Sequence, residues 1–540
     1  MTDLLKILGV IGALAAFFQL ANYGGKHWSW PAEFRRKLVH IGMGAVVIWF
    51  PWIFDSIWPV WILATLSIAA FCLLRMLSPL QRRFGAVLYG VKRQSWGEFC
   101  WPFSVALLFS LTHAQPLFYV IPIMVLALAD AGGAMVGTRY GSARYQTDDG
   151  QKSAEGSLAV FLVAFLATHI SLLLFTPLGR LECLLIGFIL GLIATLTEAI
   201  AWRGLDNFFV PIATYACLVR LAELGVTILV VHLVVLILLL VALHFCILRT
   251  YLTRSASTAT ALVLYVSWTA GDWHWLIAPL ATLAGYVALC PEHQTQPKVH
   301  NVEAITLVAS AGLLWLALSH LLPTLDTLYA YGVAYGANLS FIALAFFAHR
   351  SRRLPLLVAG VLSWTLGYAL LAIPYFMVWH EHPRVLTLAL AAALTLAICL
   401  GIFMKWQPSL KDCPNDSARW LRQTAMAGLA SLVAFFVINS LDPTIGQEKM
   451  SAHPSRVPSW SVPRLRGRGE QGKTLWQAHN LAALCCVNGK NHEIERRQRC
   501  GGPLPSPFAH HGLASEARST KEHAKGVPTF SPDRWLDLEN

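Results

Sequence analysis

Long apolar segments recur along the chain, and short polar stretches separate them. A helix needs about 20 mostly apolar residues to cross a bilayer, and most of the segments approach that length. Those near 101–112, 206–219 and 256–271 are shorter and suit re-entrant or interfacial helices. The pattern predicts an all-α, polytopic membrane protein with about sixteen spans. The segments are 4–22, 38–54, 57–75, 101–112, 116–137, 156–176, 181–200, 206–219, 223–249, 256–271, 273–290, 302–322, 330–348, 354–378, 384–404 and 424–441.

Composition and loop charge agree with this prediction. Hydrophobic residues make up 56% of the chain and charged residues 13%, whereas a soluble domain has roughly 25% charged residues. Lys and Arg gather in alternate loops, near 23–37, 75–100, 138–155, 349–353 and 405–423, and such loops stay on the cytoplasmic side. The net charge of +12 therefore reflects topology rather than a nucleic-acid-binding face. We expect a multi-pass protein of a bacterial inner (plasma) membrane, with its active site on the cytoplasmic face.

Three regions differ in character. Residues 1–255 hold nearly all the polar motifs and form one predicted membrane domain. Residues 256–442 form an additional multi-span membrane domain whose role the sequence leaves open. Residues 443–540 are a basic tail rich in Pro, Gly and Arg, which we expect to be disordered. The tail contains "GRGEQGKT", which matches the P-loop pattern, but no buried strand precedes it, so chance explains the match better.

Asp130 is the first candidate for chemistry, because it lies inside an apolar segment. A carboxylate in a span costs about 2.5–3.5 kcal/mol, so a cation, a metal or a water-filled cavity must offset it. Gly132 and Gly133 follow within one turn. They could admit a phosphate or a metal, or they could simply allow two spans to pack closely.

The loop that follows supplies cations and a helix start. Gly137 and Arg139 end the apolar segment, and Lys152 and Glu155 precede the next one. Ser153 could cap that helix with Glu155 in its first turn. A helix N-terminus beside Lys and Arg is also a suitable site for an anion such as phosphate.

Two further clusters lie at the same predicted membrane face. Glu198 ends one span, and Asp206 and Asn207 open a short apolar segment. Such oxygen ligands suit Mg²⁺ that also holds substrate phosphates. Near the second span, Arg36 and Lys37 stand at the surface and His40 lies three residues further, on the face of Lys37. These residues could anchor the span, or they could reach a lipid phosphate or a nucleotide.

Together, in this order, the motifs resemble the CTP-dependent polyprenol kinase family, which includes phytol, farnesol and dolichol kinases. The resemblance implies that CTP or another nucleotide donates a phosphoryl group to a membrane isoprenoid alcohol, with Mg²⁺ as cofactor. The chain departs from the family pattern at Ala129, where Gly is common, and at Asp148 and Asp149. The matching residues are Arg36, Lys37, His40, Asp130, Gly137, Arg139, Tyr140, Gly141, Lys152, Ser153, Glu155, Gly156, Ser157, Glu198, Gly204, Leu205, Asp206, Asn207 and Pro211.

The residues are assigned roles on this basis. We expect Asp130, Asp206 and Asn207 to hold the metal, and Glu198 or Asp206 to take the proton of the alcohol. A cytidylyltransferase similar to CDP-diacylglycerol synthases, which would release pyrophosphate, is the first alternative. A transporter is the second, although residues 256–442 show no charged pair near a midplane. The expected nucleotide- and phosphate-binding residues are Gly132, Gly133, Gly137, Arg139, Lys152, Glu155, Asn207, Arg36, Lys37 and His40.

Overall fold

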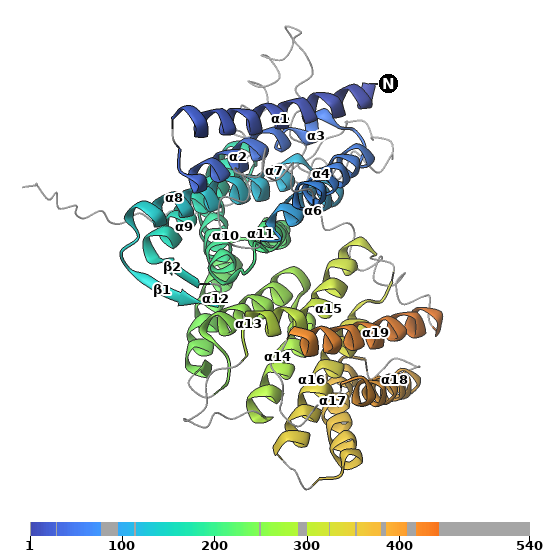
Figure 1. Ribbon diagram of the computed structural model, residues 1–540. Coiled ribbons are helices and arrows are strands. Elements are labelled where there is room, and N and C mark those ends of the chain that lie inside the picture. Colours follow the sequence, from blue (N-terminus) through green and yellow to red (C-terminus); the bar gives the residue numbers. More distant parts are fainter. Residues whose placement is uncertain are drawn as a thin grey trace, which may run out of the picture. The chain divides into compact units, whose positions relative to one another are not determined.

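In the part of the chain that it describes, a computed structural model is almost wholly helical and has one small antiparallel hairpin (Figure 1). The tail at 443–540, including "GRGEQGKT", lies outside the residues that the structure describes. Those residues are 2–28, 30–76, 95–112, 115–148, 150–247, 250–289, 300–322, 325–350, 354–379, 385–407 and 417–441.

Every apolar segment of the sequence is helical in the structure, although segment 38–54 is divided between two helices and segment 116–137 contains a turn of π-helix. The first group of helices is α1 (Thr2–His27), α2 (Ala32–Val47), α3 (Phe50–Ile53), α4 (Trp58–Met76), α6 (Gly97–Thr112), α7 (Pro116–Met124), α8 (Asp130–Tyr140), α9 (Ala154–Phe175), α10 (Arg180–Ile200), α11 (Asp206–Leu221) and α12 (Val226–Ile247). The second group is α13 (Arg254–Val266), α14 (Trp273–Leu289), α15 (Val302–Leu321), α16 (Leu328–Arg350), α17 (Leu356–Trp379), α18 (Val385–Trp406) and α19 (Ser417–Leu441).

Ten helices in the described part of the chain are long and apolar enough to cross a membrane, whereas the hydropathy pattern predicts about sixteen spans. Three further helices, at Gly97–Thr112, Trp273–Leu289 and Leu356–Leu370, are apolar but shorter. The all-α polytopic class is therefore confirmed. The segments expected to be short are helices of 16 residues in α6 and α11 and of 13 residues in α13.

A turn of π-helix, η1 (Val125–Ala129), interrupts the long helix that carries the first candidate residue. It joins α7 to α8, and Asp130 is the first residue of α8. Each π-turn accommodates an extra residue and shifts the helical face beyond it, and such turns are frequent at functional sites. A second π-turn, η2 (Ser267–Gly271), follows α13.

The largest buried cluster surrounds α10, which packs against α9, α11, α12 and α13. Because α10 lies among these helices, residues such as Ile186, Leu190 and Ile193 are fully buried. Helix α8 packs on α9 next to this core (Figure 1). The described residues fall within one compact unit, and the division between 1–255 and 256–442 stays a prediction.

The hairpin joins α8 to α9. Strand β1 (Arg144–Thr147) pairs with β2 (Gly150–Ser153), so that Tyr145 lies opposite Lys152. The loop between two membrane helices is thus an ordered projection beside the start of α9.

Candidate functional site

A polar cavity of about 610 Å³ lies where α2, α8, the hairpin, α9, α10 and α11 meet. Most of the candidate residues border it, although they come from distant parts of the sequence. Those that line the cavity are Arg36, Lys37, Asp130, Gly133, Gly137, Lys152, Glu198, Asp206 and Asn207. Lining residues that the sequence did not single out are Glu33, Ser95, Ala134, Thr138, Gln151, Val160 and Ala201.

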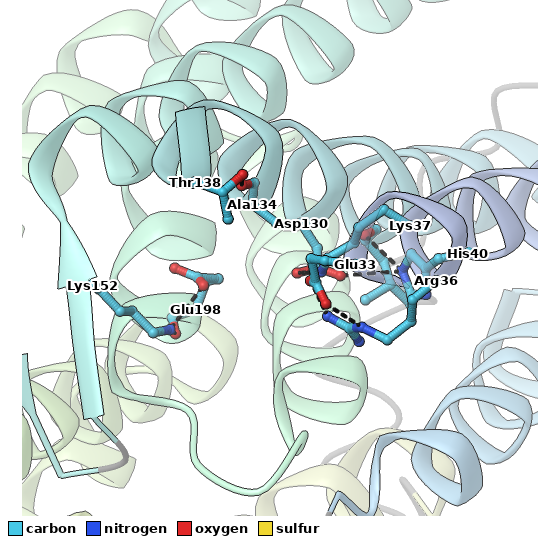
Figure 2. A network of polar contacts seen from close by, with 10 residues as sticks. Glu33, Arg36, Lys37, His40, Asp130, Ala134, Thr138, Lys152 and Glu198 are labelled. Carbon is cyan, nitrogen blue, oxygen red and sulfur yellow. Dashed lines mark hydrogen bonds and ion pairs between the residues drawn. The ribbon is translucent and has the colours of Figure 1, made fainter. Parts of the chain in front are cut away.

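Asp130 is compensated by a cation from α2. The ammonium of Lys37 donates a hydrogen bond of 2.6 Å to Asp130 Oδ1, and both side chains are largely buried (Figure 2). His40 Nε2 lies 3.7 Å from Asp130 Oδ2 and 3.3 Å from the carbonyl oxygen of Leu126 in the π-turn. Since that carbonyl can only accept, Nε2 carries the proton in this bond. The sequence left a cation, a metal or a cavity as possible partners for Asp130, and the structure provides both a cation and a cavity.

Arg36, one residue before Lys37, pairs with the preceding turn of α2. Its guanidinium donates two hydrogen bonds to Glu33, of 3.0 and 2.7 Å, in a bidentate arrangement (Figure 2). Burial raises the pKa of Glu33, but the hydrogen bond and the charge of Arg36 lower it more, so the net pKa is below its usual value. Glu33 therefore stays ionised and fixes Arg36 at the cavity wall. Glu33 is a site residue that the sequence analysis missed, although its i, i+3 spacing from Arg36 suits such a pair.

Lys152 of β2 pairs with the end of α10 at the cavity wall. Its ammonium lies 2.8 Å from Glu198 Oε1 and also donates to the backbone carbonyl of Glu198. Figure 2 shows this pair on one side and the cluster around Asp130 on the other, with Ala134 and Thr138 of α8 between them. The cavity therefore has a separate ion pair on each of two walls.

The N-terminus of α11 completes the wall with two polar side chains that lack partners. A tight turn at Arg203 and Gly204, both with positive φ, precedes Asp206. Gly204 approaches the chain so closely that an added Cβ would lie 2.7 Å from the backbone nitrogen of Gly97. In the described part of the chain the carboxylate of Asp206 has no hydrogen-bond or ion partner. Asn207 is buried, and its Oδ1 has no hydrogen-bond partner.

Four candidate residues do not border the cavity. The imidazole of His40 contacts Asp130 but does not line the cavity. Gly132 faces α9, where an added Cβ would lie 3.2 Å from a methyl group of Val163. Arg139 is exposed and its guanidinium lies 5.4 Å from the centre of the Tyr140 ring.

Glu155 is the fourth residue, and its contact with phosphate stays a prediction. It is turned outward, because its carboxylate accepts hydrogen bonds from the backbone nitrogens of Ser142 and Ala143, at 3.1 and 3.0 Å, and from the hydroxyl of Ser142. Glu155 thus fastens the loop before β1. The expected helix start is confirmed, since Ser153 caps α9 by accepting from the backbone nitrogen of Gly156 at 3.1 Å.

The glycines allow α8 and α9 to approach each other. A Cβ added to Gly133 would overlap Val160 and lie 3.2 Å from the carbonyl oxygen of Gly156. A Cβ added to Gly156 would lie 3.0 Å from the carbonyl oxygen of Gly133 and 3.2 Å from the Cα of Gly137. Close packing of two helices, one of the two readings of the sequence, therefore accounts for Gly133, while Gly133 and Gly137 also border the cavity.

The oxygen atoms of the cavity fit a magnesium ion whose remaining ligands come from the phosphates of a nucleotide. No group of three or more His, Cys, Asp or Glu side chains within the described ranges could hold a metal alone. Mg²⁺ does not need such a group, because it is commonly bound by one or two carboxylates, waters and substrate phosphates. The unpartnered oxygens of Asp206 and Asn207 are of the required type, and the charges of Arg36, Arg144 and Lys152 would balance phosphates.

The helices and this cavity define a polytopic membrane protein with a charged, phosphate-compatible site at the ends of its helices. The phytol kinase of Synechocystis sp. is 34% identical to the chain over 188 residues, which cover 34% of this chain and 77% of that relative. The chain belongs to the phytol kinase family. No family model and no solved structure matches the chain.

Proposed function

We propose that the cavity transfers a phosphoryl group from a nucleoside triphosphate, with CTP as the donor, to the hydroxyl of an isoprenoid alcohol. Phytol, farnesol and dolichol-like polyprenols are the acceptors considered. The observation that carries the proposal is that cationic side chains and unpartnered side-chain oxygens line one cavity. Cationic Arg36, Arg144 and Lys152 line the same 610 Å³ cavity as the unpartnered oxygens of Asp206 and Asn207. Membership of the phytol kinase family supports the same reaction class.

The cations bind and orient the phosphates. Arg36 is held by Glu33, and Lys152 is held by Glu198. Arg144 on β1 has no ion partner among the described residues and is available to the nucleotide. Pre-positioned cations of this kind stabilise the charge that spreads over the transferred group, which is the main requirement for phosphoryl transfer.

The carboxylates take different roles. Mg²⁺, bound by Asp130, Asp206 and Asn207, would neutralise phosphate charge and align the transferred group. In the transfer, the oxygen of the alcohol forms a bond to the terminal phosphorus while the bond to the bridging oxygen breaks. The hydroxyl proton passes to the carboxylate oxygen of Asp206 that does not hold the metal, and the nucleoside diphosphate leaves. Glu198, engaged by Lys152, then serves to position that cation rather than to accept the proton.

The membrane supplies the acceptor to this site. Positively charged loops favour the cytoplasmic side, and Arg144 and Lys152 lie in such a loop between α8 and α9. The proposed site therefore faces the cytoplasm, where nucleotides are found, and the isoprenoid chain stays among the apolar helices.

The test is a product analysis with membranes that contain the full chain. Labelled CTP, ATP or UTP is incubated with phytol, farnesol and a polyprenol, and both products are identified. The proposal expects an isoprenyl monophosphate together with CDP. Pyrophosphate with a CDP-lipid would instead identify a cytidylyltransferase, and the absence of any lipid product would remove the kinase assignment.

A further inference from the structure

The hairpin β1–β2 needs anchors beyond its own strands. It is only two strands of four residues each, and an isolated two-stranded hairpin is marginally stable in water. Yet it carries Arg144, Gln151 and Lys152 in the cavity wall. The geometry of this wall therefore depends on what holds the hairpin in place.

Two of its anchors belong to the helices of the site. Lys152 is bound to Glu198 at the end of α10. The hydroxyl of Tyr145 lies 2.7 Å from Ser157 Oγ in the first turn of α9. Both contacts hold the strands close to where they join α9, so neither holds the tip of the hairpin.

The tip is held from residues outside the site, through Asp148. Its Oδ2 accepts a hydrogen bond of 2.7 Å from the backbone nitrogen of Val302, the first residue of α15. The same oxygen accepts from the hydroxyl of Thr253, the N-cap of α13, at 3.1 Å. The backbone joins these two helix starts, since the nitrogen of Thr253 donates to the carbonyl of His300 at 3.0 Å. A carboxylate at a helix N-terminus is stabilised by free N–H groups and by the helix dipole.

We propose that Asp148 is a positioning residue, through which the helices after residue 253 hold the hairpin against the nucleotide-binding cavity. Asp148 is one of the positions where the chain departs from the polyprenol kinase pattern. The hydrogen bonds of its carboxylate to Val302 and Thr253, together called the tie, give this residue a structural role. Region 256–442 contributes no residue to the lining of the cavity. Through the tie, this region still affects the site, because it holds the hairpin that forms part of the cavity wall. This inference rests on the proposed function for the identity of the ligand, but not for the tie itself.

One substitution removes a single hydrogen bond of Asp148 at a position where the backbone accepts proline, although it also replaces a buried valine side chain. Val302 is the first helical residue of α15, where proline is tolerated because the missing N–H would have no partner within the helix. Asn301, which precedes it, has the extended backbone that a residue before proline requires. Val302→Pro therefore deletes the donor, and Asp148→Ala deletes the acceptor. Asp148→Asn keeps an acceptor oxygen and serves as the rescue variant, while Glu223→Ala removes an exposed carboxylate beyond the opposite end of α11 from Asp206.

The experiment measures hydrogen exchange of the amides in 144–153 and the steady-state kinetics of the full-length variants. We expect faster exchange in Asp148→Ala and in Val302→Pro. The KM for CTP should rise about threefold to tenfold with kcat changed less than about twofold, where tenfold corresponds to about 1.4 kcal/mol. The double variant should be no worse than Asp148→Ala, because the bond that Val302→Pro removes is already absent in that variant. Asp148→Asn and Glu223→Ala should stay close to the parent.

Unchanged exchange in Asp148→Ala would overturn the inference, and so would effects that add fully in the double variant. An equal fall in kcat for all variants with unchanged KM would show a merely structural role and would also overturn it. If the parent protein transfers phosphate to none of the alcohols, the proposed function fails. The exchange measurement then decides the tie alone, so the two failures are distinguishable.

Discussion

The ammonium of Lys37 lies 2.6 Å from Oδ1 of Asp130, although 93 residues separate them in sequence. This pair explains how a carboxylate is accommodated in a long apolar helix. Lys37 is only 3% exposed, so its charge is shielded from solvent together with that of Asp130. The second carboxylate oxygen stays on the side of His40, and Asp130 borders the cavity.

Replacing Lys37 with Met tests the structural part of this pair. The variant leaves a buried carboxylate without its cation, and breaking a buried pair on one side costs about 3–5 kcal/mol. We expect a clear fall in the thermal unfolding temperature of the protein in detergent. The double variant Lys37→Met with Asp130→Leu should recover most of the stability but no activity. A single variant as stable as the parent would show that Lys37 does not compensate Asp130.

Lys152→Met tests the cation on the opposite wall. The side chain keeps its length and loses its charge, so the interaction with nucleotide phosphates should weaken. A hydrogen bond between charged groups contributes about 1.5–3 kcal/mol, so we expect the KM for the nucleotide to rise about tenfold or more. Glu198→Gln should raise this KM less than Lys152→Met does, because the backbone carbonyl of residue 198 still accepts from Lys152. Nucleotide dependence that is the same in Lys152→Met as in the parent would remove Lys152 from the phosphate site.

Asp206→Asn tests the proposed metal ligands. Removing one negative oxygen should raise the Mg²⁺ concentration needed for half-maximal activity, because Mg²⁺ prefers charged oxygen ligands. Asn207→Asp adds a charge at the neighbouring oxygen and should shift the requirement in the opposite direction. The measurement is a magnesium titration at saturating nucleotide. Coincident titration curves for the parent and both variants would argue against a metal at this end of α11.

Two adjacent glycines test how closely α8 packs against α9. Gly133→Ala places a Cβ against Val160 and 3.2 Å from the carbonyl oxygen of Gly156, a backbone atom that cannot easily move. Gly132→Ala meets only a methyl group of Val163 at 3.2 Å. Overpacking costs about 1–3 kcal/mol, so we expect Gly133→Ala to unfold at a lower temperature and Gly132→Ala to resemble the parent. Equal unfolding temperatures would mean that α8 and α9 adjust freely.

Hydropathy was enough to place the helices, because the length and polarity of a span are local properties of the chain. The sequence also identified Asp130, Lys152, Glu198 and Asp206, since a charged residue at the end of a span needs an explanation. It could not pair Lys37 with Asp130 or Lys152 with Glu198, because partners so far apart are brought together only by helix packing.

Three residues lie in surroundings that the sequence does not show. Glu155 was expected at phosphate, but nearby backbone N–H groups of the preceding loop bind its carboxylate. Gly132 was grouped with Gly133, yet successive residues of a helix point in directions about 100° apart, so only one borders the cavity. Asp148 counted as a departure from a family pattern, because its partners Thr253 and Val302 lie more than 100 residues further along.

The most direct measurement is the rate at which labelled phosphate passes from CTP to phytol in membranes containing the parent protein, Asp130→Asn or Glu223→Ala. Asp130→Asn keeps the shape of the side chain and an acceptor for Lys37, but removes the negative charge beside the proposed metal and nucleotide. The account predicts that its transfer rate, normalised to the amount of folded protein in the membrane, falls by orders of magnitude. Glu223→Ala should transfer at the parental rate. Near-normal turnover by Asp130→Asn would contradict the account, because phosphoryl transfer would then not depend on the cavity around Asp130.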